Sequence, residues 1–151
     1  VGKATLYRRY RSKQELAKAA VVHLNDGFEV PEDTGSLTGD FAALVRTVLA
    51  LAEGTGALDV MPRLLSDVAG DEEMHELFTE HLVEPRRRVV RTLIERAIER
   101  GEVRRDIDPE LAVDMIAGPM IYRVITSGGK IERLGNPLDV LHAALEGLRP
   151  R

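Results

Sequence analysis

Residues 1–16 read VGKATLYRRYRSKQEL and combine a dense set of basic side chains with two tyrosines and a helix-start signal. Ser12 followed by Glu15 forms a capping box, in which the hydroxyl accepts a hydrogen bond from the first helical turn and the carboxylate reaches back. This spacing predicts a short helix over about residues 3–10 and a second helix from Lys13 to about Asn25.

The basic character is confined to this beginning of the chain. Residues 1–23 carry a net charge of +5, although the 151-residue chain as a whole carries −4. A charge step between a short basic part and a long acidic part indicates two parts with different partners. A loop rich in Gly, Pro, Asp and Thr follows over residues 27–39. We therefore expect one unit over residues 1–26 and a second unit over residues 27–151.

The composition is that of a soluble globular protein with one sizeable core. Hydrophobic residues make up 44% of the chain and charged residues 30%, and cysteine is absent, which excludes disulfides and thiolate chemistry. No apolar run approaches the roughly 18 residues of a spanning helix, and the start does not resemble a signal peptide. We expect a cytoplasmic protein with no membrane partner. Because the chain begins at Val1 within a motif, we also expect it to be truncated at its amino terminus.

Helical periodicity dominates the rest of the chain, and we find no convincing alternating strand, so the sequence predicts an all-α fold. An apolar stripe from Val89 to Ile98 is flanked by arginines and glutamates and ends at Gly101, a residue type that suits a helix C-terminus. Residues 108–110, Asp-Pro-Glu, predict a helix start, because they combine an N-cap, a first-turn proline and an acid near the positive helix end. Residues 136–137, Asn-Pro, predict a final helix.

The helix expected over about residues 109–127 is apolar around most of its circumference and ends at a Gly-Gly pair. A surface helix needs only one apolar stripe, so this helix has enough apolar surface to contact both its own core and a partner chain. We expect a symmetric dimer interface formed by two stripes, with these contact residues: Val90, Leu93, Ile94, Ala117, Met120, Ile121 and Val124. The alternative is that both stripes belong to the core of a single chain.

A pocket for a small apolar or amphipathic ligand is a second expectation for the helical body. Methionine adapts to irregular apolar ligands, and we expect a cavity lined by Met61, Leu65, Met74, Phe78, Met115 and Tyr122. The alternative is that these side chains are ordinary core residues, since methionine at helical spacing is common in cores.

The first helix has one side suited to packing and one suited to a DNA groove. At about 100° per residue, Leu6 and Tyr10 share a face while Ala4 and Arg8 point away from it. A small residue permits close approach, a threonine methyl can touch thymine, and a guanidinium can hold guanine through two hydrogen bonds. Lys13 lies in the first turn of the next helix, where free amides can hold a phosphate. The alternative is a solvated basic helix face.

These sixteen residues resemble the recognition-helix signature of TetR-family repressors. The matching positions are Val1, Leu6, Tyr7, Ser12, Lys13 and Leu16. Gly2 stands where serine is more usual, and Tyr10 where phenylalanine is. More loosely, residues 96–128, with a Gly-Pro-x-x-Tyr-Arg run from Gly118 to Arg123, resemble the carboxyl-terminal region of a large TetR subgroup.

The resemblance implies a remnant of a helix-turn-helix DNA-binding domain, without its first two helices, followed by a TetR-type helical ligand-binding and dimerisation domain. It implies that Tyr7 and Lys13 contact phosphates and that Arg9 is a further phosphate contact. The implied base-facing residues are Lys3, Ala4, Thr5 and Arg8. The implied function is ligand-responsive repression by a homodimer on a palindromic double-stranded operator.

No arrangement of residues indicates catalysis, a metal site or a cofactor. His75 and His81 in the run HELFTEH lie six residues apart, whereas a zinc protease helix places its histidines four apart. The run SGGK at residues 127–130 lacks the leading glycine, the Ser or Thr after the lysine, and the strand that a phosphate-binding loop needs. We therefore expect neither an enzyme nor a metalloprotein. The alternative to a regulator is a helical dimerisation protein that binds no small molecule.

Overall fold

The computed structural model describes residues 12–55, 57–130, 133 and 135–150. The prediction of an all-α fold is confirmed, because the elements of the described residues are helical. Seven α-helices and one π-helical turn are described, in this order: α2 (Lys13–His23), α3 (Leu37–Thr55), α4 (Ala57–Ala69), α5 (Glu72–Phe78), η1 (Thr79–Val83), α6 (Glu84–Arg100), α7 (Pro109–Ser127) and α8 (Pro137–Leu148). The short helix expected over residues 3–10 lies outside the described residues.

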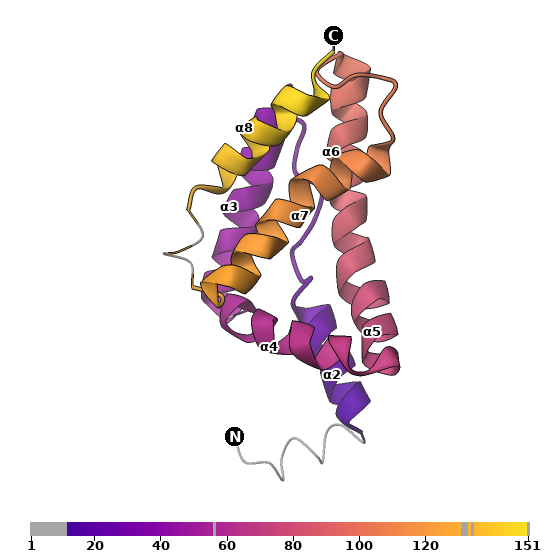
Figure 1. Cartoon of the computed structure of the whole chain (residues 1–151), viewed down its shortest axis with the longest axis vertical. Coiled ribbons are helices and arrows are strands. Elements are labelled where there is room, and N and C mark those ends of the chain that lie inside the picture. Colours follow the sequence, from indigo (N-terminus) through magenta and orange to yellow (C-terminus); the bar gives the residue numbers. More distant parts are fainter. Residues whose placement is uncertain (1–11, 56, 131–132, 134, 151) are drawn as a thin grey trace.

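Two long helices, α3 and α6, run along the long axis of the molecule (Figure 1). The helix α7 crosses in front of them diagonally and packs against both α6 and α8, while α8 lies along α3. The helices α2, α4 and α5 gather at the opposite end from Leu148. The molecule therefore has a body of α3, α6, α7 and α8, with α2 attached at one end of it.

The predicted helix boundaries are confirmed where they depend on local chemistry. The side chain of Ser12 accepts a hydrogen bond from the Glu15 amide at 3.1 Å, and Asp108 accepts one from the Glu110 amide at 3.0 Å. Asn136 caps α8 in the same way. Gly101 and Gly128 end α6 and α7 with φ of +78° and +66°, a left-handed conformation that glycine adopts without steric cost.

The main core lies between α3, α6, α7 and α8, and α6 contributes one complete side to it. Its buried residues are Leu37, Phe41, Leu44, Val89, Val90, Leu93, Ile94, Ala97, Val103, Ile107, Ala112, Val113, Ile116, Leu141 and Leu148. This placement corrects the expectation that Val90, Leu93 and Ile94 contact a partner chain. Leu93 and Ile94 are fully buried within their own chain and Val90 nearly so, which leaves them almost no surface for a partner.

A second core lies at the end of the molecule where α2, α4, α5 and η1 meet. Val21, Val68, Phe78 and Leu82 are its buried members. The partly buried side chains packed against it are Leu24, Met61, Leu64, Leu65, Leu77 and Val83. Since Val21 belongs to α2 and is almost completely buried, the second core attaches α2 to the body through hydrophobic contact.

The junction between α5 and α6 is the π-helical turn η1, which immediately precedes Pro85. A break or kink at this proline is expected from the sequence, because proline has no N–H to donate to the carbonyl four residues earlier. That carbonyl belongs to His81, and it accepts a hydrogen bond from Asn25 Nδ2 at 2.5 Å. The irregular turn thus provides a backbone acceptor for the segment that follows α2.

The start of α3 is fastened to the end of α6 by a buried ionic cluster around Asp40, which is fully enclosed. Asp40 Oδ1 accepts hydrogen bonds from the Thr34 amide and hydroxyl at 2.8 and 2.7 Å, and Oδ2 accepts one from Arg100 Nη2 at 3.1 Å. Arg100 Nε also donates to Glu102, whose other oxygen accepts from the Leu37 amide. Burial alone would raise the pKa of Asp40, but these hydrogen bonds and the guanidinium charge outweigh it and lower the pKa.

We expect Asp40→Asn to lower the free energy of unfolding by about 2–3 kcal/mol at neutral pH, because it leaves Arg100 without its buried partner. The loss stays below that of a fully buried pair, since the Arg100 side chain retains 22% exposure. Because the pKa of Asp40 is lower in the folded state, its ionised carboxylate stabilises the folded protein fully at pH values above about 4, the ordinary pKa of aspartate. This stabilisation is lost as the pH falls through the pKa that Asp40 has in the folded state. Urea unfolding between neutral and acidic pH measures both effects.

The matched control is Asp106→Asn, because Asp106 has an exposed side chain. This control should change stability by less than about 0.5 kcal/mol. Equal losses in the two variants, or an Asp40→Asn variant whose stability depends on pH as strongly as the native protein, would contradict the role assigned to Asp40.

Candidate functional site

The DNA-contacting residues expected from the sequence mostly precede the described part of the chain. Lys3, Ala4, Thr5, Tyr7, Arg8 and Arg9 lie outside the described residues. Lys13 is the first residue of α2, directly after its N-cap Ser12. The helix start that would present a phosphate-binding lysine is therefore in place, and the contacts themselves remain predictions.

The carboxyl end of α2 is held to the body by four residues that we call the Arg86 cluster: Leu24, Asn25, His81 and Arg86. Arg86 donates from Nε to Asn25 Oδ1 at 2.9 Å and from Nη2 to the Leu24 carbonyl at 2.8 Å. The Asn25 amide donates in turn to the His81 carbonyl. A cation beside the last carbonyl groups of a helix is favourable, because those groups carry partial negative charge.

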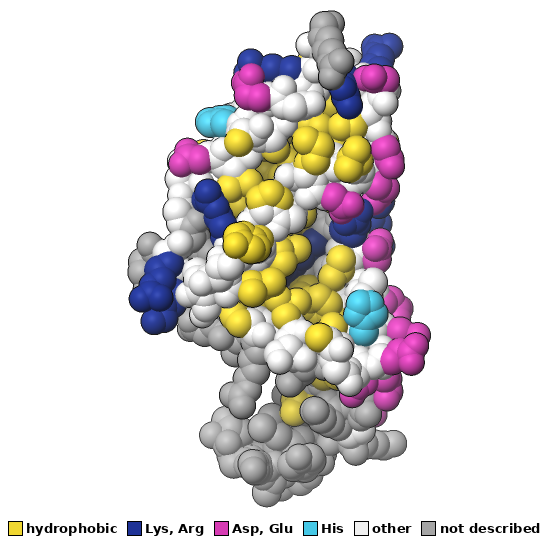
Figure 2. Space-filling view, viewed as in Figure 1, with side chains coloured by type: hydrophobic (Ala, Val, Ile, Leu, Met, Phe, Trp, Pro, Cys, Tyr) yellow, Lys and Arg dark blue, Asp and Glu magenta, His cyan; other side chains and the backbone are white. Residues whose placement is uncertain are grey.

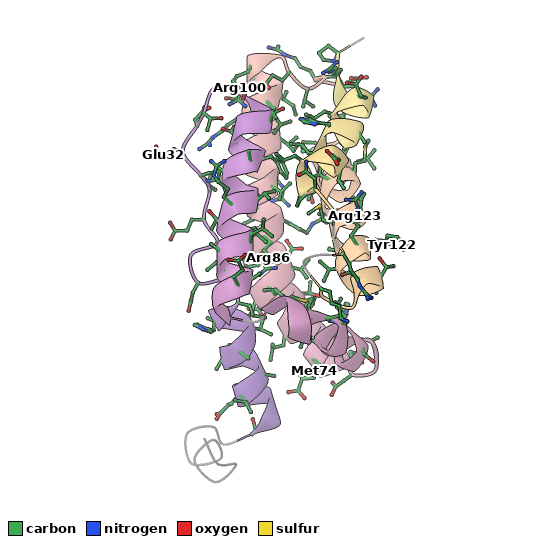
Figure 3. The ribbon with its side chains drawn as sticks, turned by 90° about the vertical axis from the view of Figure 1, so that its left-hand side faces the viewer. Glu32, Met74, Arg86, Arg100, Tyr122 and Arg123 are labelled. Carbon is green, nitrogen blue, oxygen red and sulfur yellow. The ribbon has the colours of Figure 1, made fainter. Side chains whose placement is uncertain are left out.

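Arg86 lies at the seam between the two cores. Its guanidinium stacks over the ring of Phe28, 5.0 Å from the ring centroid, and Phe28 packs against the main core. Its acceptor Leu24 packs against the second core. Figure 3 shows Arg86 near the place where α2, α3 and α6 come together. Among the described residues no carboxylate forms an ion pair with Arg86, and burial lowers its pKa to about 10.

The face that carries α7 is hollowed. Figure 2 shows a depression between α7 and α6, with hydrophobic side chains around it and a basic side chain deeper inside. Sequence reasoning did not find Arg86, since it belongs to a run of three arginines, Arg86–Arg88, at the start of a charged helix. Only its hydrogen bonds to Asn25 and the Leu24 carbonyl, which follow α2, separate this arginine from its neighbours.

The structure gathers three of the six expected pocket residues. Met61, Leu65 and Phe78 belong to the second core or pack against it, whereas Met74 is buried on α5 outside this cluster. Met115 packs against the main core, and Tyr122 is 67% exposed. Figure 3 shows Tyr122 on the outer side of α7, far from Met74. The expected lining is thus divided between the second core, the main core and the outer surface.

The outer side of α7 carries an exposed apolar face. Its large exposed residues are Leu111, Ile121, Tyr122 and Ile125, each about half exposed or more. The expected interface residues Ala117, Met120 and Val124 are half-buried on the same helix. Figure 2 shows these hydrophobic side chains as a diagonal band along α7. Sequence reasoning found Ile121 for this interface and missed Leu111, Tyr122 and Ile125. Their spacing is a visible signal, because Ile125 lies three residues after Tyr122 and Leu111 lies eleven residues, about three helical turns, before it.

The beginning of α7 is fixed to α6 by ion pairs at one edge of this face. Arg87 donates to Asp114 at 2.5 Å and to Glu110 at 2.7 Å, and Arg91 also donates to Glu110. The hydrogen bonds from Arg91 and Arg87 lower the pKa of Glu110 to about 2. Because these side chains are partly or largely exposed, they orient α7 rather than provide much stability.

The described part of the chain lacks two kinds of feature. No helix there is both long and apolar enough to span a membrane. No three histidine, cysteine, aspartate or glutamate side chains come together there as a candidate metal site.

Comparison with known proteins adds three findings. The family model described as "Tetracyclin repressor-like, C-terminal domain" matches residues 31–133. An uncharacterized HTH-type transcriptional regulator of Bacillus subtilis is 31% identical over 135 residues, covering 87% of this chain and 66% of that protein. The DNA-binding transcriptional repressor TetR of Mycobacteroides abscessus is 32% identical over 140 residues, covering 91% of this chain and 68% of that protein.

A crystal structure of a TetR family transcription regulator superposes with a TM-score of 0.75 at 22% identity, covering 99% of this chain and 82% of that one. At this identity the similarity concerns the fold. The chain spans about two thirds of the length of the curated relatives it matches.

We expect Asn25→Ala to loosen the end of α2, because it removes the acceptor of Arg86 and the donor to His81 together. A loss of about 1–2 kcal/mol is typical of such part-buried hydrogen bonds, so amide hydrogen exchange in α2 should accelerate roughly tenfold. Mass spectrometry of peptides from α2 and from α8 measures whether the effect is local. Asp26→Ala, next in sequence and exposed, is the control, and equal acceleration in both variants would contradict the role of the Arg86 cluster.

Proposed function

The chain belongs to the TetR family of transcriptional regulators, and we propose that it acts within a homodimeric repressor that binds operator DNA and releases it when a small molecule binds. The observation that carries the proposal is the exposed apolar face of α7 in a chain whose residues 31–133 match the family's carboxyl-terminal domain. The three parts of the proposal are a dimer face on α7, a DNA-reading segment before α2, and a ligand-sensitive connection between them.

The partner that fits the α7 face is a second copy of this chain. Leu111, Ile121, Tyr122 and Ile125 are exposed large side chains on one helix. The neighbouring helix α8 adds the exposed small residues Ala143 and Gly147, which permit close helix approach. In a two-fold symmetric contact each copy presents the same patch, so one apolar face covers another. Two helices from each chain can bury the roughly 1,600 Å² typical of a specific interface.

A dimer of this kind supports the DNA-binding part of the proposal. The basic residues 1–23 precede or belong to α2, which lies at one end of the long body (Figure 1). Two copies related by a two-fold axis would present two basic segments to one face of a duplex. Recognition helices that read successive major grooves lie about 34–36 Å apart. The operator is therefore expected to be palindromic, with its half-site spacing determined by the dimer.

The ligand-responsive part depends on how α2 is attached. Its two attachments are the second core and the Arg86 cluster. A molecule that occupies this region can change the position of α2 relative to the dimer face. The change in DNA affinity is limited by the difference between the ligand's affinities for the two arrangements.

We expect Ile121→Glu and Ile125→Glu each to weaken dimerisation by roughly 30-fold or more, because a symmetric interface contains every substitution twice and central apolar contacts dominate binding. Sedimentation equilibrium measures the association. Because both side chains are about half exposed in the single chain, the helical circular dichroism should remain. Val30→Glu, an exposed apolar residue in the loop before α3, is the control; dimers that survive both α7 substitutions would exclude this face.

We expect Arg8→Ala and Lys13→Ala to weaken DNA binding in different ways. Loss of a base-contacting arginine should cost about 1–3 kcal/mol and relax specificity at one base position. Loss of a phosphate contact should weaken all sequences alike and reduce the slope of log affinity against log salt by about 1. Fluorescence anisotropy of the full gene product on DNA upstream of its own gene, across a salt series, measures both. Unchanged binding in both variants would show that residues 3–13 do not read DNA.

A further inference from the structure

The guanidinium of Arg86 has unused hydrogen-bonding capacity. Its hydrogen bonds employ Nε and Nη2, both with neutral acceptors. No described residue accepts a hydrogen bond from Nη1, and no described carboxylate neutralises the charge. Arg86 is only partly exposed. A charged group in such a position is usually paired, because removing it from water is costly.

The end of α2 favours a cation, but its partial negative charge balances only part of the charge of Arg86. The Leu24 carbonyl and the Asn25 side chain are neutral acceptors, which a neutral donor could also satisfy. An arginine offers in addition a planar pair of donors with the geometry that matches a carboxylate. The lowered pKa of Arg86 agrees with a site whose charge is incompletely compensated in the unliganded chain.

The surroundings of Arg86 are apolar on both sides. Phe28 and the main core lie on one side, and Leu24 with the second core lies on the other. Figure 2 shows hydrophobic side chains around a depression on the face that carries α7. A ligand that complements this arrangement has an apolar body and one anionic head.

We propose that the seam between the two cores binds an amphipathic small molecule with a single carboxylate, whose head pairs with Arg86 and whose apolar part lies between α4, α6 and α7. The inference rests on the proposed function, since it names the chemical class of ligand to which the regulator responds. The charge of Arg86 selects the acid, and the apolar border selects its hydrocarbon part.

The same arginine connects this ligand to α2. A carboxylate on Nη1 draws the guanidinium toward the hollow, and Nε and Nη2 move with it because the group is rigid and planar. These are the atoms that hold Asn25 and the Leu24 carbonyl. Ligand binding therefore changes the hydrogen bonds at the end of the helix that leads to the DNA-reading segment.

The test compares three carboxylates (octanoate, decanoate and naphthoate) with their matching alcohols (octanol, decanol and naphthyl methanol). Isothermal titration calorimetry on the chain of residues 1–151 measures binding without DNA. We expect at least one carboxylate to bind roughly 10-fold to 100-fold more tightly than its alcohol, the range of a charge-assisted hydrogen bond. Arg86→Gln should remove this preference while leaving alcohol binding within about threefold.

Two further variants make the result decisive. Arg88→Gln, two residues along the same helix and exposed, should leave the preference intact. Arg86→Lys keeps a cation without the planar pair of donors and should retain only part of the preference. If Arg86→Gln does not fold, the Arg86→Lys variant provides the test by itself. A preference for carboxylates over alcohols that is undiminished in Arg86→Lys would then overturn the proposal. Absence of any carboxylate binding, or a preference that survives Arg86→Gln, overturns it as well.

This experiment can fail independently of the proposed function. If the full gene product binds operator DNA and alcohols release it as well as carboxylates do, the regulator stands and the acidic ligand class is wrong. If the carboxylate preference depends on Arg86 but no operator DNA is bound, the ligand site stands and the repressor proposal is wrong.

Discussion

The arrangement of this molecule depends on the burial of one side of α6. Leu93, Ile94 and Ala97 have no exposed surface, and helices α3 and α7 both pack against α6. Burying a full side of a helix between two neighbours removes its apolar area from water, which is the main favourable contribution to folding. The helices α3 and α7 pack directly against α6, and α8 packs against α3 and α7.

Arginines along the edges and at the ends of this buried side of α6 orient the neighbours that the core attracts. Arg86 holds the end of α2, Arg87 and Arg91 hold the start of α7, and Arg100 holds the start of α3. Arg96 donates to the Pro31 carbonyl in the loop before α3. Hydrophobic contact is not directional, whereas a guanidinium has donors at defined angles. The core thus provides the attraction, and the arginines determine where each segment is placed along α6.

These arginines differ in what they imply, because their environments differ. Arg87 and Arg91 pair with partly or largely exposed carboxylates, so water screens them and their main effect is orientation. Arg100 faces the enclosed Asp40, where removal of one partner leaves an uncompensated charge. Arg86 is placed between two apolar clusters with neutral acceptors. The carboxylates nearby therefore decide what each arginine does. Arg87 and Arg91 orient α7, Arg100 belongs to a buried ionic cluster, and Arg86 keeps a donor that no described residue uses.

Local chemistry in the sequence by itself determined the helical class, the caps at Ser12, Asp108 and Asn136, and the ends at Gly101 and Gly128. These features depend on residues within one turn of each other. The tertiary structure alone decided that the stripe of α6 is enclosed, which side of α7 stays exposed, and that the expected pocket residues divide between the interior and the outer surface. Helical periodicity reports that a side is apolar, but the neighbour that covers that side comes from residues distant in sequence. The significance of Arg86 has the same origin, since its acceptors lie 61 and 62 residues away along the chain.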